Sequence, residues 1–464
     1  RLRDSESNTV AGDTNTLDDS DNNTVAGTQN YVDESDNNTV AGDQNELDNA
    51  DGNQVAGSEN DVTDSDDNTV AGTENDLDLA YNNQVAGNSN EVYDALNNTV
   101  AGDDNRVAYA DNNTVSGVSN WVAFSDNNVV AGDDNNVWFG SDNNSVVGTG
   151  NDVVNDSDNN QVAGDDNRVS YSDNNSVSGE SNWVAFSYNN SVAGDDNNVW
   201  FGSDNNSVVG EGNLVTLDSD ANQVAGLTNV VVDSDNNTVA GDDNVLFESD
   251  ANQVAGNDNY LENADDNTVS GTYNDVIDSQ DNVVAGLRNA LINDSDHNTV
   301  TGQFNDLDNS DNNQVSGYDN AITDSDNNTV AGDTNTLITS NDNQVTGVDN
   351  TLTESNENTV AGDSNTLLRS DENTVAGNDN RLRDSESNTV AGDTNTLDDA
   401  DNNTVAGNNN YLEYSDDNQV TGTSNYLTDS NENTVAGDSN RLLRSDENTV
   451  AGNDNRLRDS ESNT

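Results

Sequence analysis

Aspartate recurs at two fixed places in this 464-residue sequence, at a spacing suited to cation binding. One place follows a repeated serine and the other a repeated glycine; the residues are Asp21, Asp36, Asp126, Asp133, Asp134, Asp165 and Asp166. If copies of the repeat stack, each place becomes a row of like charges about 5 Å apart, which is unfavourable without counterions. Carboxylate, amide and carbonyl oxygens are the ligands that Ca²⁺ prefers. We therefore expect bound Ca²⁺ at these corners, the alternative being an acidic surface that is simply solvated in a salty medium.

Groups suited to catalysis are scarce. The sequence has no cysteine, and its one histidine, His297, replaces an asparagine of the repeat. No residues have the spacing of a nucleophile and its base, of a metal-ligand motif or of a phosphate-binding loop. Carboxylate pairs occur at every corner, too often to single out a glycosidase site. We predict that the chain is not an enzyme, and a carbohydrate-active solenoid enzyme ranks last among our hypotheses.

Asn-Asn-Thr and Asn-Asn-Ser triplets recur at one place in the repeat. They make candidate glycosylation acceptors of Asn22, Asn37, Asn112 and Asn143, among others. Exposed turns of a secreted protein tolerate glycans. A repeat rich in Asn and Thr also produces such triplets by chance, so both interpretations stay open.

The sequence has four tryptophans, and all of them fall at positions expected to point outward. They are Trp121, Trp138, Trp183 and Trp200. Exposed aromatic residues in so polar a chain indicate a contact patch. The alternative, equally favoured, is that they only wrap the slightly wider turns described next.

All of these residues belong to one fifteen-residue repeat, represented by SDNNTVAGTQNYVDE at 20–34. Five copies have sixteen residues, and the extra one always follows the second apolar position, which indicates a loop there. The positions of Asn23, Val25, Gly27 and Asn30 never change between copies, and that of Val32 is always Val, Leu or Ile. Each half of the repeat is typical of one short strand and one corner. A short period sustained without a break is typical of a solenoid.

The repeat therefore predicts an all-β fold, a two-sided flattened β-solenoid of about 30 coils. Each coil has 15 and occasionally 16 residues, and no helix is expected because the repeat consists largely of poor helix formers. We predict a single continuous solenoid over 1–464. Both termini lie within a turn and have no capping segment, so we expect the chain to be a section of a longer tandem-repeat protein.

Alternation along each strand predicts which side chains point inward. We expect Asn23, Val25 and Gly27 to do so in the first strand, and Asn30 and Val32 in the second. The aliphatic residues would form a dry core, and each Asn would bond the same amide in the turns above and below. Gly27 would supply a positive φ or room for close backbone approach.

The charge balance limits the possible partners. The sequence has 90 acidic residues against 12 arginines, a formal charge of −78. Nucleic acid and anionic membranes are thereby disfavoured. The chain has no apolar run long enough for membrane insertion.

The two strands differ in their outward residues. The first shows Thr, Gln, Ser or Val and then Ala, Ser, Thr or Val, a flat, nearly uncharged face, whereas the second shows almost any residue. The alternation N-x-V-x-G-x-x-N-x-V resembles the β-roll repeats of bacterial and archaeal surface adhesins and extracellular fibres. The resemblance implies a secreted structural protein of the cell surface or matrix, a filament or adhesin stalk that assembles with itself end to end and laterally, with surface glycans as a further candidate partner. The Ala-Gly step and the Thr-bearing face are also similar to ice-nucleation and insect antifreeze solenoids. This second resemblance implies, as the alternative, an ice-binding or ice-nucleating protein that uses the flat Thr/Ala face.

Overall fold

The computed structural model describes residues 1–444, 449–452 and 456–458. The chain divides into two compact units, Arg1–Asn236 and Asn237–Thr464, and each is described by itself. Both are stacks of turns in which two short strands alternate, which confirms the predicted all-β, two-sheet solenoid. The described residues form no helix, and hence none that is long and apolar enough to cross a membrane. Continuity of one solenoid over 1–464 stays a prediction.

The strand bounds follow the invariant residues of the repeat. Each even-numbered strand from β2 to β46 begins after the first Asn and ends one residue after the Gly, as in β4 (Thr24–Thr28). From β48 (Thr359–Ala361) to β60 (Thr449–Ala451), the even-numbered strands cover three residues. Each odd-numbered strand covers the three residues after the second Asn, as in β5 (Tyr31–Asp33). The exceptions are β1 (Leu2–Arg3), β11 (Asp76–Tyr81) and β13 (Glu91–Leu96).

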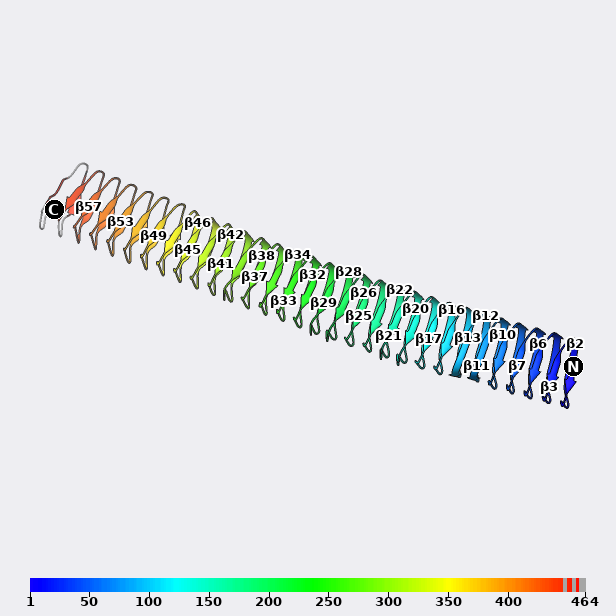
Figure 1. Ribbon diagram of the computed structural model, residues 1–464. Coiled ribbons are helices and arrows are strands. Elements are labelled where there is room, and N and C mark those ends of the chain that lie inside the picture. Colours follow the sequence, from blue (N-terminus) through cyan, green and yellow to red (C-terminus); the bar gives the residue numbers. More distant parts are fainter. Residues whose placement is uncertain (445–448, 453–455, 459–464) are drawn as a thin grey trace. The chain divides into compact units, whose positions relative to one another are not determined.

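Successive turns pair in parallel and in register, so that equivalent residues lie side by side. In unit 1, Thr24 of β4 is opposite Thr39 of β6 (Thr39–Asp43), and unit 2 pairs in the same way. In each unit the even-numbered strands form one sheet and the odd-numbered strands the other (Figure 1). The sixteen-residue turns keep this register, with Val129 opposite Ser145. Gly140, at φ 73°, lies in the corner that takes up the extra residue of its turn.

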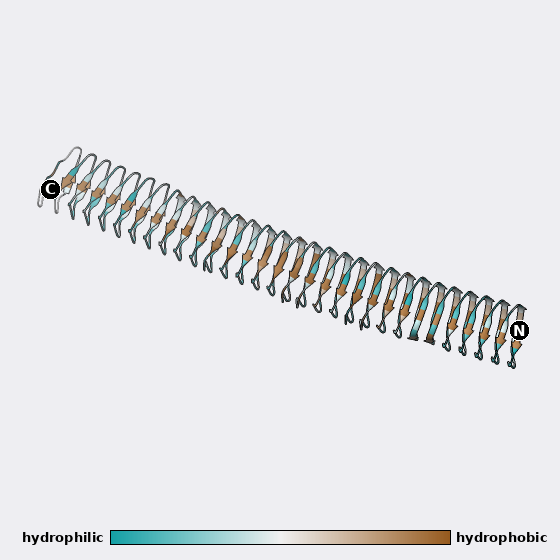
Figure 2. Cartoon of the chain, viewed as in Figure 1, coloured by the Kyte–Doolittle hydropathy of each residue, from teal (hydrophilic) through white to brown (hydrophobic). Residues whose placement is uncertain are grey.

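The core of each unit is a double file of aliphatic side chains between the two sheets. In unit 1, Val25 is 1% exposed and Val32 is fully buried. The file of the odd-numbered strands is mostly Val in unit 1 and mostly Leu in unit 2, as at Leu246 and Leu261. Figure 2 shows these hydrophobic residues along the strands. Full burial of one such side chain contributes about 1.5–3 kcal/mol, and every turn adds an equivalent pair.

Buried asparagines bond to backbone groups at both corners of most described turns; Nδ2 of Asn128, Asn190 and Asn282 is an exception. Asn30 donates from Nδ2 to Oδ1 of Asn15 at 3.0 Å and to the carbonyl oxygen of Gly42 at 2.7 Å. At the other corner, Asn23 donates from Nδ2 to the carbonyl oxygen of Ser35 at 2.7 Å. Because a buried polar group without a partner is costly, these amides fix the position of each turn on its neighbours.

Gly27 has both properties expected of the invariant glycine. Its φ is 129°, and a Cβ built on it would lie 1.8 Å from the carbonyl oxygen of Gly42 in the next turn. Any larger residue would force the two turns apart at this corner.

Candidate functional site

On the outer surface of the even-numbered strands, the outward position after the Gly is often acidic, as at the exposed Asp43 of β6, but an uncharged strip runs beside it in both units. We call this strip the Thr/Ala face and define it by the two outward positions on either side of the inward Val, Thr24 and Ala26 in β4. Both are exposed, whereas Val25 between them is buried. In the other described turns the first row holds Thr, Gln, Ser or Val and the second holds Ala, Ser, Thr or Val. In-register pairing places row members about 4.7–4.9 Å apart along the stack, and the rows about 6.6 Å apart along the strand.

Some turns replace the hydroxyl or methyl group of this face with a larger aliphatic side chain. Val129, Val147 and Val209 in unit 1 and Val283 in unit 2 are between 46% and 50% exposed. These valines are accommodated without loss of register, as the pairing of Val129 with Ser145 shows. The face therefore keeps its regular spacing where its chemistry changes.

The outer surface of the odd-numbered strands carries individual charges instead. Glu91 and Arg106 are neighbours in successive turns, and their side chains form an exposed ion pair of 3.4 Å. Further along, Arg369 pairs with Glu354 at 3.0 Å. Such exposed pairs contribute little to stability, but their ions hold water strongly. The two faces of each unit thus differ in charge as well as in regularity.

The aspartates that follow the repeated serine accept hydrogen bonds from backbone N–H groups at the corner. Oδ1 of Asp36 accepts from the backbone N–H of Asp21 at 2.5 Å, and Oδ1 of Asp126 accepts from that of Asp111 at 2.7 Å. One oxygen of each of these two carboxylates therefore caps the preceding turn. Binding of Ca²⁺ by this row stays a prediction, and it would use the other carboxylate oxygens.

The aspartates that follow the repeated glycine lie at the opposite corner. The four residues Asp133, Asp134, Asp165 and Asp166 are exposed there. Oδ1 of Asp133 accepts from the backbone N–H of Val118 at 3.1 Å. Asp134 and Asp166 have φ of 57° and 55°, the left-handed conformation that Asp tolerates better than most residues.

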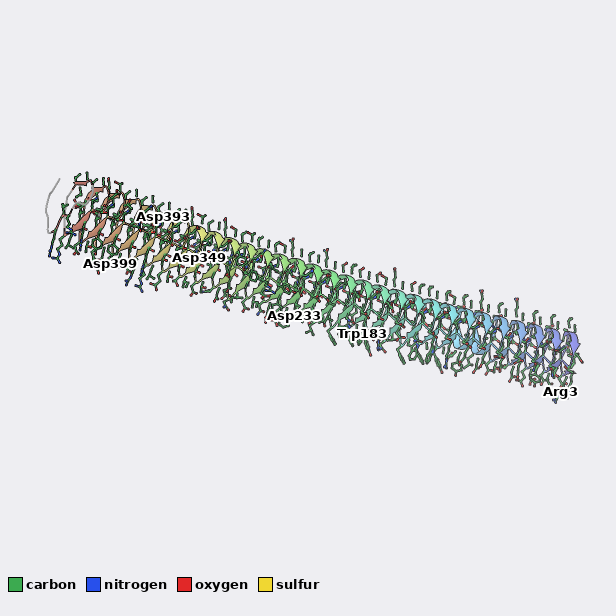
Figure 3. The ribbon with its side chains drawn as sticks, turned by 90° about the horizontal axis from the view of Figure 1, so that it is seen from above. Arg3, Trp183, Asp233, Asp349, Asp393 and Asp399 are labelled. Carbon is green, nitrogen blue, oxygen red and sulfur yellow. The ribbon has the colours of Figure 1, made fainter. Side chains whose placement is uncertain are left out.

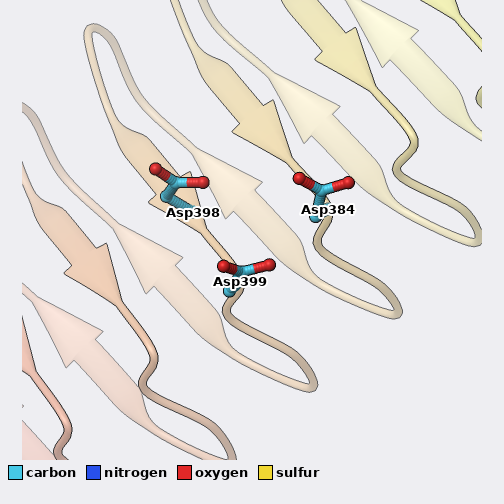
Figure 4. Close-up of side chains that lie close together, drawn as sticks. All are labelled: Asp384, Asp398 and Asp399. Carbon is cyan, nitrogen blue, oxygen red and sulfur yellow. The ribbon is translucent and has the colours of Figure 1, made fainter.

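Three other carboxylates, which the sequence pattern does not single out, converge in unit 2. Asp384 follows β51 (Arg381–Arg383). Asp398 is the last residue of β53 (Thr396–Asp398), and Asp399 comes directly after it (Figure 4). One oxygen of each lies within 4.8 Å of the others. Arg383 is 3.3 Å from Asp384, and Arg369 is 3.7 Å from it on the other side. These guanidinium groups offset part of the negative charge, so the cluster by itself does not point to a metal.

Burial raises the pKa of several carboxyl groups. It is the main cause of the raised pKa of Asp142 and Asp204, where a backbone N–H acts in the opposite direction. On the odd-numbered strands, burial likewise raises the pKa of Asp76, Asp275 and Asp306. The ionised form of these groups is therefore less favourable in the folded chain than in water.

The candidate glycosylation acceptors are exposed at one corner. Asn22, Asn37, Asn112 and Asn143 have φ between 60° and 63°, and the backbone N–H of Asn22 donates to the carbonyl oxygen of Glu6 at 3.0 Å. The backbone of this corner is therefore held by the neighbouring turn, and the side-chain amide of Asn22 is in solvent. Glycosylation at these residues stays a prediction.

The tryptophans lie on the outer surface of the odd-numbered strands of unit 1. Trp183 is 37% exposed and points away from the ribbon (Figure 3), and the other three are half-buried. Trp121 packs edge-on against Trp138 with ring centroids 4.0 Å apart, and Trp183 packs in the same way against Trp200 at 4.6 Å. Each pair belongs to one copy of a duplicated segment. The contact-patch prediction is taken up below.

A buried column of Ser or Ala runs along each unit, at the first position of the repeat. Ser20 donates from Oγ to the carbonyl oxygen of Asp18 at 2.7 Å and accepts from the backbone N–H of Ser35 at 3.0 Å. The restriction of this position to Ser or Ala in every copy was the available signal.

These features define a β-solenoid of the β-roll type, built from tandem repeats. A family model described as the grass antifreeze β-roll matches residues 224–323 and 375–457. No curated protein matches the chain. The chain is thus similar over those residues to a family whose members are typically non-catalytic.

Proposed function

We propose that this chain is a secreted ice-binding protein and that the Thr/Ala face is the surface that contacts ice. The observation that carries the proposal is that the two rows of this face are in register and uncharged throughout the described turns and that most of their residues are exposed. The similarity to the grass antifreeze β-roll supports both the function and an extracellular location.

The chemistry of the face suits a neutral, periodic array of water molecules. A charged side chain keeps its own hydration shell and gives it up only at high cost. Thr and Gln offer donors and acceptors, and Ala and the Thr methyl group cover the space between them. Thr374 and Ala376 in β50 (Thr374–Ala376) illustrate this arrangement, which the turns on either side repeat.

The face is also held rigidly from behind. Below Thr374 and Ala376 lies the buried Val375, and Asn373 donates from Nδ2 to Oδ1 of Asn358 at 3.1 Å. A surface whose positions are fixed before binding loses little conformational entropy when it meets a crystal.

The test compares two exposed threonines of the same unit. Thr374→Lys places a charge on the Thr/Ala face, whereas Thr366→Lys places the same charge on the outer surface of β49 (Thr366–Leu368). We expect the first variant to lose thermal hysteresis and inhibition of ice recrystallisation, and the second to keep both. Absence of both activities from the unaltered chain, or equal loss in the two variants, contradicts the proposal.

A second candidate function is the self-assembling extracellular filament or adhesin stalk. The exposed aliphatic residues Val129, Val147 and Val209 on the same face favour lateral packing of two copies. Particle size measured by light scattering separates the candidates, because a filament forms in solution without ice.

A further inference from the structure

We propose that a hollow beside Trp138 and Phe139 binds one or a few rings of an uncharged oligosaccharide. The hollow has a volume of about 310 Å³ and opens on the outer surface of the odd-numbered strands of unit 1. It lies over β19 (Asn136–Trp138), β21 (Asp152–Val154) and β23 (Arg168–Ser170). The Thr/Ala face is on the other sheet, so this inference does not depend on ice binding.

The wall of the hollow is aromatic and is supported from the preceding turn. Phe139 is stacked parallel to Phe124, with centroids 6.1 Å apart, and Trp138 packs edge-on against Phe139 at 5.7 Å. Phe124 and Phe139 are each 52% exposed. In the next turn Asn155 occupies the equivalent corner position, so a small amide side chain follows the large aromatic side chains of the two preceding turns. That step forms the hollow.

The aromatic residues are placed where the backbone disfavours them. Phe124 and Phe139 have φ of 54° and 56°, the left-handed region that bulky residues rarely adopt. Many other turns fill this position with Asp, Asn or Glu, such as Glu34 and Asn49. Residues held in an unfavourable conformation concentrate at functional sites. Phe186 and Phe201 of the duplicated segment have the same conformation, so the backbone does not by itself distinguish the two copies.

Apart from Val154, the rest of the lining is polar and balanced in charge. Oδ1 of Asp152 accepts from Nδ2 of Asn136 at 2.8 Å, and the carboxylate has further acceptor positions. The guanidinium of Arg168 lies 5.3 Å from the ring centroid of Trp183, and Asn155 donates from Nδ2 to Oγ of Ser170 at 3.1 Å. One carboxylate, one guanidinium and two amides together can bind neighbouring hydroxyl groups.

This combination selects a neutral sugar among the possible ligands. A sugar ring presents C–H groups that suit an aromatic wall and hydroxyl groups that suit the polar lining. The formal charge of −78 repels polyanions, including acidic sugars. An apolar protein surface would remove water from the charged groups of Asp152 and Arg168 without offering new hydrogen bonds.

A duplication within the chain supplies a matched control. The segment 106–164 recurs as 168–226, and the wall residues Trp138 and Phe139 recur as Trp200 and Phe201. Three of the four polar lining residues are replaced in the second copy: Leu214, Leu217 and Val230 stand where the first has Asp152, Asn155 and Arg168, whereas Asn136 recurs as Asn198. If the tryptophans served only to cover the wider turns, the two copies would not differ in sugar binding.

The test uses the fluorescence of the full chain, whose four tryptophans all lie in the two copies. The probes are cellohexaose, maltohexaose and mannohexaose, with trigalacturonic acid as the anionic comparison. We expect a saturable change with at least one neutral probe and none with the acid. Trp138→Ala and Asp152→Leu should each weaken binding at least about tenfold, the scale of a central contact residue, while Trp200→Ala leaves it within about twofold.

A converse variant gives a second readout. Leu214→Asp, Leu217→Asn and Val230→Arg together should create a second site and double the stoichiometry measured by calorimetry. Circular dichroism checks that each variant is folded. Failure of all three neutral probes at about 10 mM, well above a weak Kd of 1 mM, overturns the proposal. So does tighter binding of the acid, or equal weakening by Trp138→Ala and Trp200→Ala.

Discussion

The side-chain amide of Asn30 donates a hydrogen bond of 3.0 Å to Oδ1 of Asn15, its counterpart one turn earlier. Oδ1 of Asn30 in turn accepts from Nδ2 of Asn45 at 2.9 Å. The same relationship recurs through the described turns of both units, for example from Asn410 to Asn395 at 2.9 Å. Each asparagine is therefore both a donor and an acceptor in a chain of buried amides, and the loss of one affects two neighbours.

Asn45→Ala should destabilise unit 1 strongly. The substitution deprives Nδ2 and the backbone N–H of Asn60 of their acceptor, and the carbonyl oxygen of Gly57 of a donor. Each group left without a partner costs roughly 1–3 kcal/mol. Urea unfolding measures the loss, with the exposed neighbour Glu46→Ala as the control. Equal midpoints for the two variants would contradict a structural role for the amide chain.

Gly72→Ala should be among the most damaging single substitutions. Its φ is 134°, and the added Cβ would lie 1.7 Å from the carbonyl oxygen of Gly87, a backbone atom that cannot move alone. We expect a loss of about 3 kcal/mol or more in stability, with faster hydrogen exchange in the adjoining turns. Gly52→Asn is the control, because the nearest atom there belongs to the movable Asp67 side chain and other turns have Asn at this position. A folded Gly72→Ala variant of unchanged stability would refute the close approach.

Acidification from pH 7 towards 4 should raise the melting temperature. Burial raises the folded-state pKa of Asp76, Asp275 and Asp306 above the ordinary value of 3.8. The folded state thus binds protons more tightly than the unfolded state. Keeping these carboxyl groups ionised destabilises the folded state at neutral pH, and this destabilisation is relieved as the pH falls through the raised pKa values towards 3.8.

The variant Asp275→Asn tests this pH dependence. It should stabilise the protein at pH 7 and weaken the effect of acidification, and 1 M NaCl should leave its effect in place, because desolvation is the cause of the raised pKa of Asp275. Melting at constant ionic strength provides the measurement. A melting temperature that falls between pH 7 and pH 5 would show that these three partly desolvated carboxyl groups do not control stability.

Ca²⁺ at the serine-side corner should stabilise the chain beyond simple screening. We expect CaCl₂ to raise the melting temperature above that in NaCl of equal ionic strength, because an ion that binds only the folded state stabilises it. Asp126→Asn should reduce the difference. The variant keeps an acceptor for the N–H of Asp111, as Asn341 does naturally for Asp326 at 2.6 Å. Equal melting temperatures in the two salts would contradict Ca²⁺ binding, and the carboxylates would then only accept hydrogen bonds from the preceding turn.

The repeat made the two-sheet solenoid predictable. Alternation indicates that Val25 and Val32 point inward, and the extra residue of the longer turns indicates a loop, where the structure has Gly140. The roles of Ser20 and of the Asp36 carboxylate were not predictable in the same way, because their partners lie fifteen residues away and depend on side-chain conformation. The hollow beside Trp138 was also not predictable from the repeat pattern, because the pattern indicates that Trp138 points outward but not which side chains surround it.

The sequence by itself determined the period, the inward residues and the uncharged character of one face, because side-chain direction in a strand alternates with every residue. Only the tertiary structure decided which side chains meet across turns. It paired Arg106 with Glu91, gave the Asp21 N–H an acceptor in Asp36, and brought Asp152 and Arg168 beside Trp138. These contacts depend on distances between turns and on the rotamers of long side chains, and a repeat pattern contains neither.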